Sequence, residues 1–140
     1  MDKLFPEEKI IIYTDGGSRG NPGPAAIGAV VGSKKYGEYI GEATNNVAEY
    51  KALIFALKKA KALLGKKQAA ETDVKVNLDS ELLVKQLDGH YKILDINLQP
   101  LFIEVWNLKL DFKNVELKHI PRERNKEADR LVNEALDKRI

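Results

Sequence analysis

The stretch KIIIYTDGGSRGNPGP, residues 9–24, places a run of β-branched and aromatic side chains directly before an acid and a glycine-rich segment. A near-continuous apolar run of this length is typical of a central strand that is buried on both faces. We expect the strand to end at Asp15, and the following glycines, asparagine and prolines to form a loop. Asp15 would then lie where a buried strand meets solvent.

The apolar period changes in an orderly way after this loop. Alternation over residues 26–31 and 36–43 predicts two more strands in an antiparallel meander. Helical spacing is clearest over residues 47–64, whereas residues 65–72 are polar and we expect them to be mobile. Further strands are predicted at residues 74–78 and 115–119, and further helices at residues 82–87, 98–110 and 126–136.

The order β-β-β-α-β-α-α-β-α predicts an α/β fold with a five-stranded mixed sheet flanked by helices. Strand–helix–strand units favour parallel crossovers, whereas three consecutive short-looped strands favour antiparallel pairing. No composition shift divides the chain, so we expect a single domain over residues 1–140.

Composition narrows the class of protein. The 140 residues include no cysteine, which excludes disulfides, zinc-thiolate sites and thiol catalysis. Residues 1–9 lack the apolar core of a signal peptide, and no apolar run reaches membrane-spanning length. We therefore expect a cytoplasmic protein without membrane association. Nothing in the sequence requires an obligate protein partner or more than a monomer.

Four acids stand at the ends of predicted elements, namely Asp15, Glu49, Asp79 and Asp129. Ligands of such sheets gather at the carboxyl ends of central strands, so these side chains could converge. Each acid also has a local explanation. Asp15 could begin a turn, and Glu49 could complete a capping box with Asn46. Asp79 could cap a helix, and Asp129 could lie in the first turn of the last helix, where the helix dipole stabilises a negative charge.

The residues around these acids resemble the motifs of type 1 ribonuclease H. The segment TDGGS at residues 14–18, followed by GNPGP at residues 20–24, is similar to the first motif of that family. TNNVAE at residues 44–49, DS at residues 79–80 and NKEAD at residues 125–129 resemble its later motifs in the same order. A single TDG would be weak, but the ordered set covers nearly the whole chain.

This resemblance implies a ribonuclease H-like fold and endonucleolytic hydrolysis of the RNA strand of an RNA–DNA hybrid, leaving 5′-phosphate and 3′-hydroxyl ends. It implies two Mg²⁺ or Mn²⁺ ions held by Asp15, Glu49, Asp79 and Asp129, with Asp15 bridging both. Hard cations of this kind prefer carboxylate oxygens. The sequence alone leaves two rival functions open, namely a nuclease of the same fold acting mainly on double-stranded RNA or branched DNA, and a non-catalytic nucleic-acid-binding module.

The resemblance also assigns substrate contacts, which are Gly16, Gly17, Ser18, Asn21, Thr44, Asn45, Asn46, Ser80 and Glu81. Discrimination between RNA and DNA requires contacts to the 2′-hydroxyl, and neutral amides suit phosphates and groove edges. The alternative for most of these side chains is turn or cap chemistry. Glu81 stands where several relatives carry glutamine, and its role is open.

Two residues compete for the role of an auxiliary catalytic group. His119 lies ten residues before the last acid, the spacing at which many relatives place a histidine, but it is followed by Ile120-Pro121 and could lie on the strand. If its side chain points inward from that strand, Arg122 on the next loop takes the role. His90 has no comparable context and is expected at the surface.

We expect a short form of the family, without the basic handle that some relatives use to grip the duplex and without a separate hybrid-binding domain. Net charge is only +2, so charge distribution matters more than bulk charge. Two basic groups could substitute for the handle: lysines within residues 58–67, and lysines and arginines within residues 118–130. The first group could equally be a solvated helix face.

Overall fold

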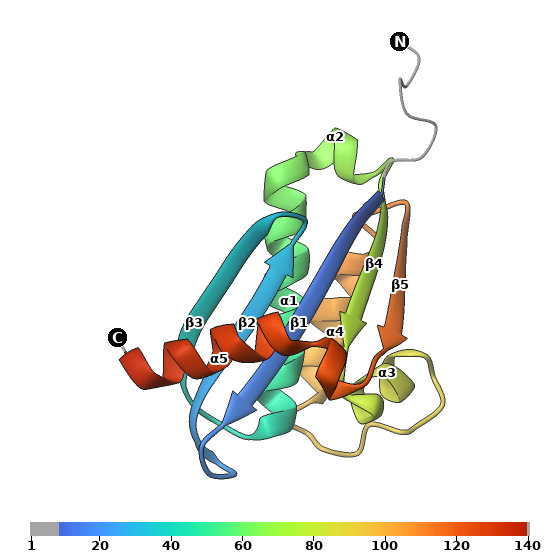
Figure 1. Cartoon of the computed structure of the whole chain (residues 1–140). Helices are drawn as coiled ribbons and strands as arrows, with labels where there is room; N and C mark the ends of the chain where they lie inside the picture. The colour runs from blue at the N-terminus through green and yellow to red at the C-terminus, as the bar shows by residue number, and fades with distance from the viewer. Residues whose placement is uncertain (1–8, 140) are drawn as a thin grey trace.

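The computed structural model describes residues 9–139, which form one five-stranded sheet with helices on both faces (Figure 1). The sheet has the order β3-β2-β1-β4-β5. Its strands are β1 (Lys9–Ser18), β2 (Gly23–Val31), β3 (Lys34–Ala43), β4 (Asp73–Leu78) and β5 (Asn114–His119). The expected single domain also included residues 1–8 and 140, which lie outside the described residues.

The strand pairing confirms the predicted mixed sheet. β2 runs antiparallel to both β1 and β3, whereas β4 is parallel to β1 and β5 is parallel to β4. β1 is therefore the central strand, as its apolar run predicts. The carboxyl ends of β1 and β4 meet at the same edge of the sheet.

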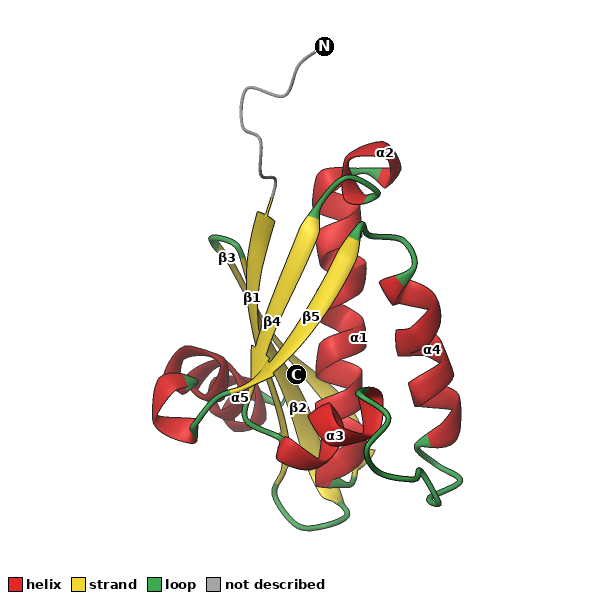
Figure 2. Ribbon diagram, turned by 90° about the vertical axis from the view of Figure 1, so that its right-hand side faces the viewer, coloured by secondary structure: helices red, strands yellow, loops and turns green. Residues whose placement is uncertain are grey.

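Five α-helices and one 3₁₀ turn complete the described chain: α1 (Asn45–Leu64), α2 (Lys66–Ala69), α3 (Glu81–Leu87), α4 (Gln99–Lys109), η1 (Arg122–Arg124) and α5 (Lys126–Lys138). Figure 2 shows α1, α3 and α4 on one face of the sheet and α5 alone on the other. The main core lies between the sheet and α1, where Ile12, Leu53, Leu57 and Val76 are fully buried. A smaller cluster of Ala26, Val132 and Leu136 packs α5 onto β2. None of the described helices is both long enough and apolar enough to cross a bilayer.

Two segments that were described as loops from the sequence contain regular structure. β1 does not end at Asp15 but continues to Ser18, because Gly16, Gly17 and Ser18 pair with residues 25–27 of β2. Asp15 therefore lies within a strand and does not begin a turn. Within residues 65–72 the chain forms the short helix α2, which the sequence pattern did not predict, and its Ala69 is fully buried in the main core.

Two glycines allow helices to approach the central strands closely. A Cβ atom at Gly16 would overlap the carbonyl oxygen of Ala48 in α1, and one at Gly28 would overlap the carbonyl oxygen of Ala128 in α5. Because glycine has no side chain, the helix backbone can rest directly on the strand at both points. One contact therefore fixes α1 on one face, and the other fixes α5 on the opposite face.

We predict that Gly28→Ala lowers the free energy of unfolding by about 1–3 kcal/mol, because α5 must move away from β2. The matched control is Gly17→Ala on β1, where a Cβ would make only an ordinary contact of 3.7 Å with Val132. We expect that control to change the free energy of unfolding by less than about 1 kcal/mol. Urea denaturation of both variants makes the comparison, and equal losses would contradict the close-approach argument.

Candidate active site

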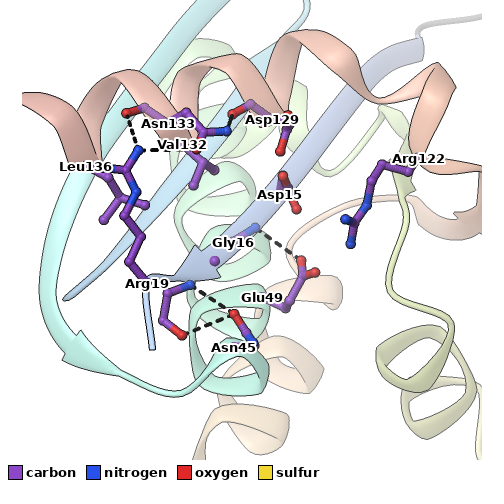
Figure 3. Close-up of a pocket in the computed structure, with 12 residues that line it drawn as sticks. Asp15, Gly16, Arg19, Asn45, Glu49, Arg122, Asp129, Val132, Asn133 and Leu136 are labelled. Carbon is purple, nitrogen blue, oxygen red and sulfur yellow. Dashed lines mark hydrogen bonds between the residues drawn. The ribbon is translucent and has the colours of Figure 1, made fainter. Parts of the chain in front are cut away.

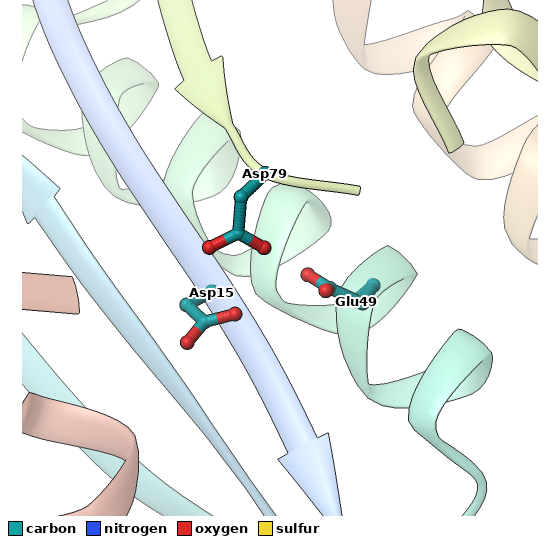
Figure 4. A group of neighbouring side chains, drawn as sticks. All are labelled: Asp15, Glu49 and Asp79. Atoms are coloured by element: carbon teal, nitrogen blue, oxygen red, sulfur yellow. The ribbon is translucent and has the colours of Figure 1, made fainter. Parts of the chain in front are cut away.

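Three of the predicted acids meet at the carboxyl edge of the central strands (Figure 4). Asp15 lies in β1, Asp79 directly follows the neighbouring β4, and Glu49 extends from the first part of α1. Each offers a carboxylate oxygen, and these oxygens lie within 4.8 Å of one another. The segments come from three distant parts of the chain, so the cluster exists only in the folded protein.

The fourth acid, Asp129, reaches the same place from the opposite face of the sheet. It lies in the first turn of α5, close enough to Asp15 that its negative charge raises the pKa of the Asp15 carboxyl. Asp129, Asp15 and Glu49 all line one cavity of about 390 Å³ (Figure 3). The structure thus brings all four predicted acids together around Asp15.

The local explanations for two of the acids are wrong. The side-chain cap of α1 is Thr44, whose hydroxyl accepts a hydrogen bond from the Val47 amide, so neither Asn46 nor Glu49 forms a capping box. Glu49 instead accepts a hydrogen bond of 3.1 Å from the Gly16 amide, across to β1. Asp79 does not cap α3, because Ser80 occupies that position and accepts from the Leu83 amide.

Crowding of the acids shifts their protonation strongly. Burial, together with the negative charges of Asp79 and Asp129, raises the pKa of Asp15 from 3.8 to about 8, and burial is the largest cause. Burial likewise raises the pKa of Glu49 well above its usual range, with Asp15 and Asp79 adding to the effect. The Gly16 amide and the Arg122 guanidinium lower the pKa of Glu49, but burial and the two acids outweigh them.

This donor set fits divalent metal ions. Two unit charges about 4 Å apart repel by roughly 4 kcal/mol at an effective dielectric near 20, so four ionised carboxylates need a compensating charge. Carboxylate oxygens are the ligands that hard cations such as Mg²⁺ and Mn²⁺ prefer. A cation bound by Asp15, Glu49 and Asp79 would favour the ionised forms of Asp15 and Glu49.

The predicted substrate residues form a connected rim beside the acids. The side-chain oxygen of Asn45 accepts from the Ser18 amide at 2.9 Å and from its hydroxyl at 3.1 Å, and the Asn21 side chain accepts from the Asn45 amide. Of the nine predicted contact residues, Gly16, Gly17, Ser18 and Asn45 line the cavity, together with Asp15 and Glu49. Thr44 and Ser80 are not among the residues that line the cavity; each caps a helix, as the capping alternative predicted for Thr44.

Asn21, Asn46 and Glu81 lie outside the lining of this cavity. Asn21 is exposed in the loop between β1 and β2, and Asn46 is exposed in the first turn of α1, where it lies with Ser80 beside Glu49 in a small adjoining depression. Glu81 is exposed in the first turn of α3. These residues can reach a ligand that extends beyond the acids, but not one confined to the cavity.

His119 and Arg122 differ in position. His119 is the last residue of β5, pairs with Leu78 and is exposed. Arg122 lies three residues later in η1, lines the cavity and directs its guanidinium toward the acids (Figure 3). His119 therefore lies on the strand β5, which was one of the two locations that the sequence left open.

Arg19 and Asn125 are polar residues of the site to which no role was assigned from the sequence. Arg19 lines the cavity, forms an ion pair of 2.8 Å with Asp137 and so ties the β1–β2 turn to α5. Asn125 is buried behind the acids, and its side chain contacts Asp79. Arg19 sits in a loop of varied polar residues, and Asn125 begins the NKEAD motif at a position where a helix cap explains asparagine, so the pattern indicated no separate role at the site for either side chain.

Comparisons with known proteins agree with this geometry. A family model described as reverse transcriptase-like matches residues 13–135. The chain is 41% identical over 136 residues to a bifunctional protein of Mycobacterium tuberculosis, and 41% identical over 135 residues to ribonuclease HI of Halobacterium salinarum. Each alignment covers 92% of this chain, but only 36% of the mycobacterial protein and 65% of the halobacterial one.

Two solved structures match over nearly their whole length. LC11-RNase H1, isolated from compost by a metagenomic approach, has a TM-score of 0.86 and 49% identity, with 94% of this chain and 97% of that chain covered. LC11-RNase H1 in complex with an RNA/DNA hybrid has a TM-score of 0.87 and 48% identity, with 92% and 97% covered. These neighbours share the mixed sheet and its helices.

We predict that the metal-free protein loses stability as pH rises. Between pH 4 and 8 folded Asp15 retains a proton that the unfolded chain has released, so the unfolding free energy falls with rising pH across that interval. Each pKa unit corresponds to about 1.4 kcal/mol, so the loss from pH 5 to 8 is on the order of a few kcal/mol. Asp15→Asn should reduce the slope and leave the part that comes from Glu49, whose pKa burial also raises.

Urea denaturation in the presence of EDTA at pH 5, 6, 7 and 8 measures this slope. Glu127, whose pKa is lowered to about 2 by Arg130 and Lys35, titrates below the interval and does not interfere. The exposed Asp88→Asn serves as the control and should keep the wild-type slope. A flat profile for the wild-type chain would show that the folded site does not retain the proton.

Proposed function

This chain belongs to the type 1 ribonuclease H family, and from that membership we propose that it is an endonuclease that hydrolyses the RNA strand of RNA–DNA hybrids. The observation that carries the proposal is the convergence of Asp15, Glu49 and Asp79 within 4.8 Å, with Asp129 beside them. A relative of 48% identity has been solved in complex with an RNA/DNA hybrid, which supports this substrate. The products would carry 5′-phosphate and 3′-hydroxyl ends.

The acidic cluster and the ribonuclease H relatives indicate the use of divalent metal. More specifically, we propose two Mg²⁺ ions, replaceable by Mn²⁺, with Asp15 as the shared ligand. Glu49 and Asp79 would complete one set of ligands and Asp129 the other. When bound, such ions supply an acidified water and neutralise charge that develops on the phosphodiester.

The remaining residues of the site orient the ligands and the substrate. The Gly16 amide holds the Glu49 carboxylate toward β1, so that side chain is positioned before any ligand arrives. The Asn21, Asn45 and Ser18 network fixes the backbone beside Asp15, where donors and acceptors can read the ribose 2′-hydroxyl. We therefore propose that these rim residues discriminate RNA from DNA.

We assign the auxiliary role to Arg122. Its guanidinium faces the acids across the cavity, and in that position it can donate hydrogen bonds to a phosphate oxygen beside the scissile bond. A permanently charged donor at this point would also favour the entry of a polyanion into an acidic pocket. We further propose, from the sequence alone, a cytoplasmic monomer that needs no protein partner.

Cleavage assays on matched duplexes test the function. Wild-type protein with Mg²⁺ should cut the RNA strand of an RNA–DNA hybrid and leave DNA–DNA intact, and EDTA should abolish the cleavage. Asp15→Asn should reduce the hybrid cleavage to background while the circular dichroism spectrum stays native, because the shared ligand is lost. Near-normal turnover of this variant would contradict the metal assignment.

The same panel separates the rival functions. Faster cleavage of RNA–RNA or of a branched DNA than of the hybrid would assign the fold to another substrate. Retention of hybrids in a gel-shift assay, without cleavage under any divalent metal, would assign it to a binding module.

Arg122→Gln and His119→Ala form a discriminating pair. Loss of a hydrogen bond to a charged group costs about 1.5–3 kcal/mol, so Arg122→Gln should slow turnover by about 10- to 100-fold. His119→Ala should stay within about threefold of wild type, because this side chain is exposed on β5 and is not among the residues that line the cavity. The reverse ranking under saturating hybrid would reassign the auxiliary role to His119.

A further inference from the structure

Asn125 occupies the residue before α5, the position at which an asparagine ordinarily caps a helix. Its side chain does not cap α5, because it accepts no hydrogen bond from an amide of the first turn. Only 1% of the residue is exposed. A buried carboxamide that does not serve its own helix needs another explanation.

The side chain points into the sheet behind the acids. Nδ2 of Asn125 donates to the carbonyl oxygen of Thr14 at 2.8 Å and to Oδ2 of Asp79 at 3.2 Å. This orientation of the amide is determined by its partners, since the flipped form would place the Asn125 oxygen against two other acceptors. The donor therefore faces both Asp79 and the residue that precedes Asp15.

The backbone of Asn125 reaches a third acid. Its carbonyl oxygen accepts a hydrogen bond of 3.1 Å from the Asp129 amide, which closes the first turn of α5. One buried residue thus contacts the Asp15 strand, the Asp79 carboxylate and the turn that carries Asp129. β1, β4 and α5 are distant segments of the chain, so Asn125 links three elements that carry or precede the acids.

Carboxamide chemistry suits this position. An amide donates to a carboxylate without adding positive charge, so it can fix the Asp79 side chain without competing with a cation for the same cluster. Partners that orient a ligand in this way commonly contribute 10- to 100-fold to metal affinity. A lysine or arginine at the same point would neutralise Asp79 and weaken the attraction for the ion.

We propose that Asn125 is a positioning residue for divalent metal, which holds the Asp79 carboxylate in the orientation that binds the ion. The inference rests on the proposed function only in taking Asp79 as a metal ligand. Asn125 acts through Asp79 and need not touch the substrate. Its contribution is therefore measurable in the absence of nucleic acid.

The test is Mn²⁺ binding to the protein without substrate, by isothermal titration calorimetry. Asn125→Ala removes the donor, whereas Asn125→Ser keeps a residue that can cap α5 but is too short to reach Asp79. Both variants should lower the affinity for Mn²⁺ by about 10- to 100-fold. In an Asp79→Asn background, Asn125→Ser should cause less than a twofold further change, because the partner of the amide has lost its charge.

Val105→Ala provides the control for a purely structural effect. This fully buried residue of α4 lies in the main core, so its truncation lowers stability without touching the acids. We expect its Mn²⁺ affinity to stay within twofold of wild type. A loss of affinity in Val105→Ala equal to that in the Asn125 variants would overturn the proposal, because it would trace the effect to general destabilisation.

Asp15→Asn separates this inference from the proposed function. If Asp15→Asn weakens Mn²⁺ binding but Asn125→Ser binds as tightly as wild type, the positioning role is wrong and the metal site stands. If Asp15→Asn leaves Mn²⁺ binding unchanged, the metal assignment falls and the Asn125 inference falls with it. Weakened binding in both variants, with no cleavage of any duplex, would retain the positioning role and reject the nuclease.

Discussion

The close approach of two helices to the central strands, at Gly16 and Gly28, is the constraint on which the acidic site depends. At each contact the helix residue that rests on the glycine comes directly before an acid, Glu49 in α1 and Asp129 in α5. Gly16 follows Asp15 in β1, and Gly28 is the cross-strand partner of Asp15 in β2. Each of these backbone contacts lies next to an acid in the sequence, so the contacts set the distances from Asp15 to Glu49 and to Asp129. They leave the carboxylates little freedom to move apart.

Packing that holds the acids together also makes them costly. The pKa of Asp15 rises to about 8 because burial and neighbouring charge oppose its ionisation, so without a cation the site works against folding. The chain offsets part of this cost with uncharged donors, the Gly16 amide for Glu49 and the Asn125 amide for Asp79. Arg122 is the cation whose charge favours ionised Glu49. Partial compensation leaves a site that a divalent ion can complete, which a full set of arginine or lysine partners would prevent.

Sequence patterns predicted the parts of this arrangement that depend on local periodicity. The central strand, the long helix and the order of the elements follow from apolar spacing, and the ordered motifs identified the acids. The continuation of β1 to Ser18 was missed because consecutive glycines indicate a loop, whereas Gly16 and Gly17 pair with residues of β2 that are distant from them in the pattern. α2 was missed because one turn is too short to show a period, although Ala69 is fully buried. The role of Asn125 was hidden because its contacts join segments that are 46 and 111 residues apart.

Distance decides which basic residues can help to hold a duplex. The lysines of residues 58–67 begin nine residues after Glu49 on α1, which at 1.5 Å per residue is about 13 Å along the axis. Lys58 and Lys61 form ion pairs with Glu104 and Asp111, in and just after α4. Because exposed pairs of this kind are worth only about 0–1 kcal/mol, the pairing alone would not prevent these lysines from binding phosphates. Their separation from the acids exceeds the screening length of about 8 Å at physiological salt. They can therefore attract phosphates far from the cleaved bond, but not those beside it. α2, which carries the last of them, lies at the end of the molecule opposite α3 (Figure 1). Arg122 is therefore the basic residue best placed to act on the cleaved strand, and recognition at the bond itself rests on hydrogen bonds and shape more than on charge.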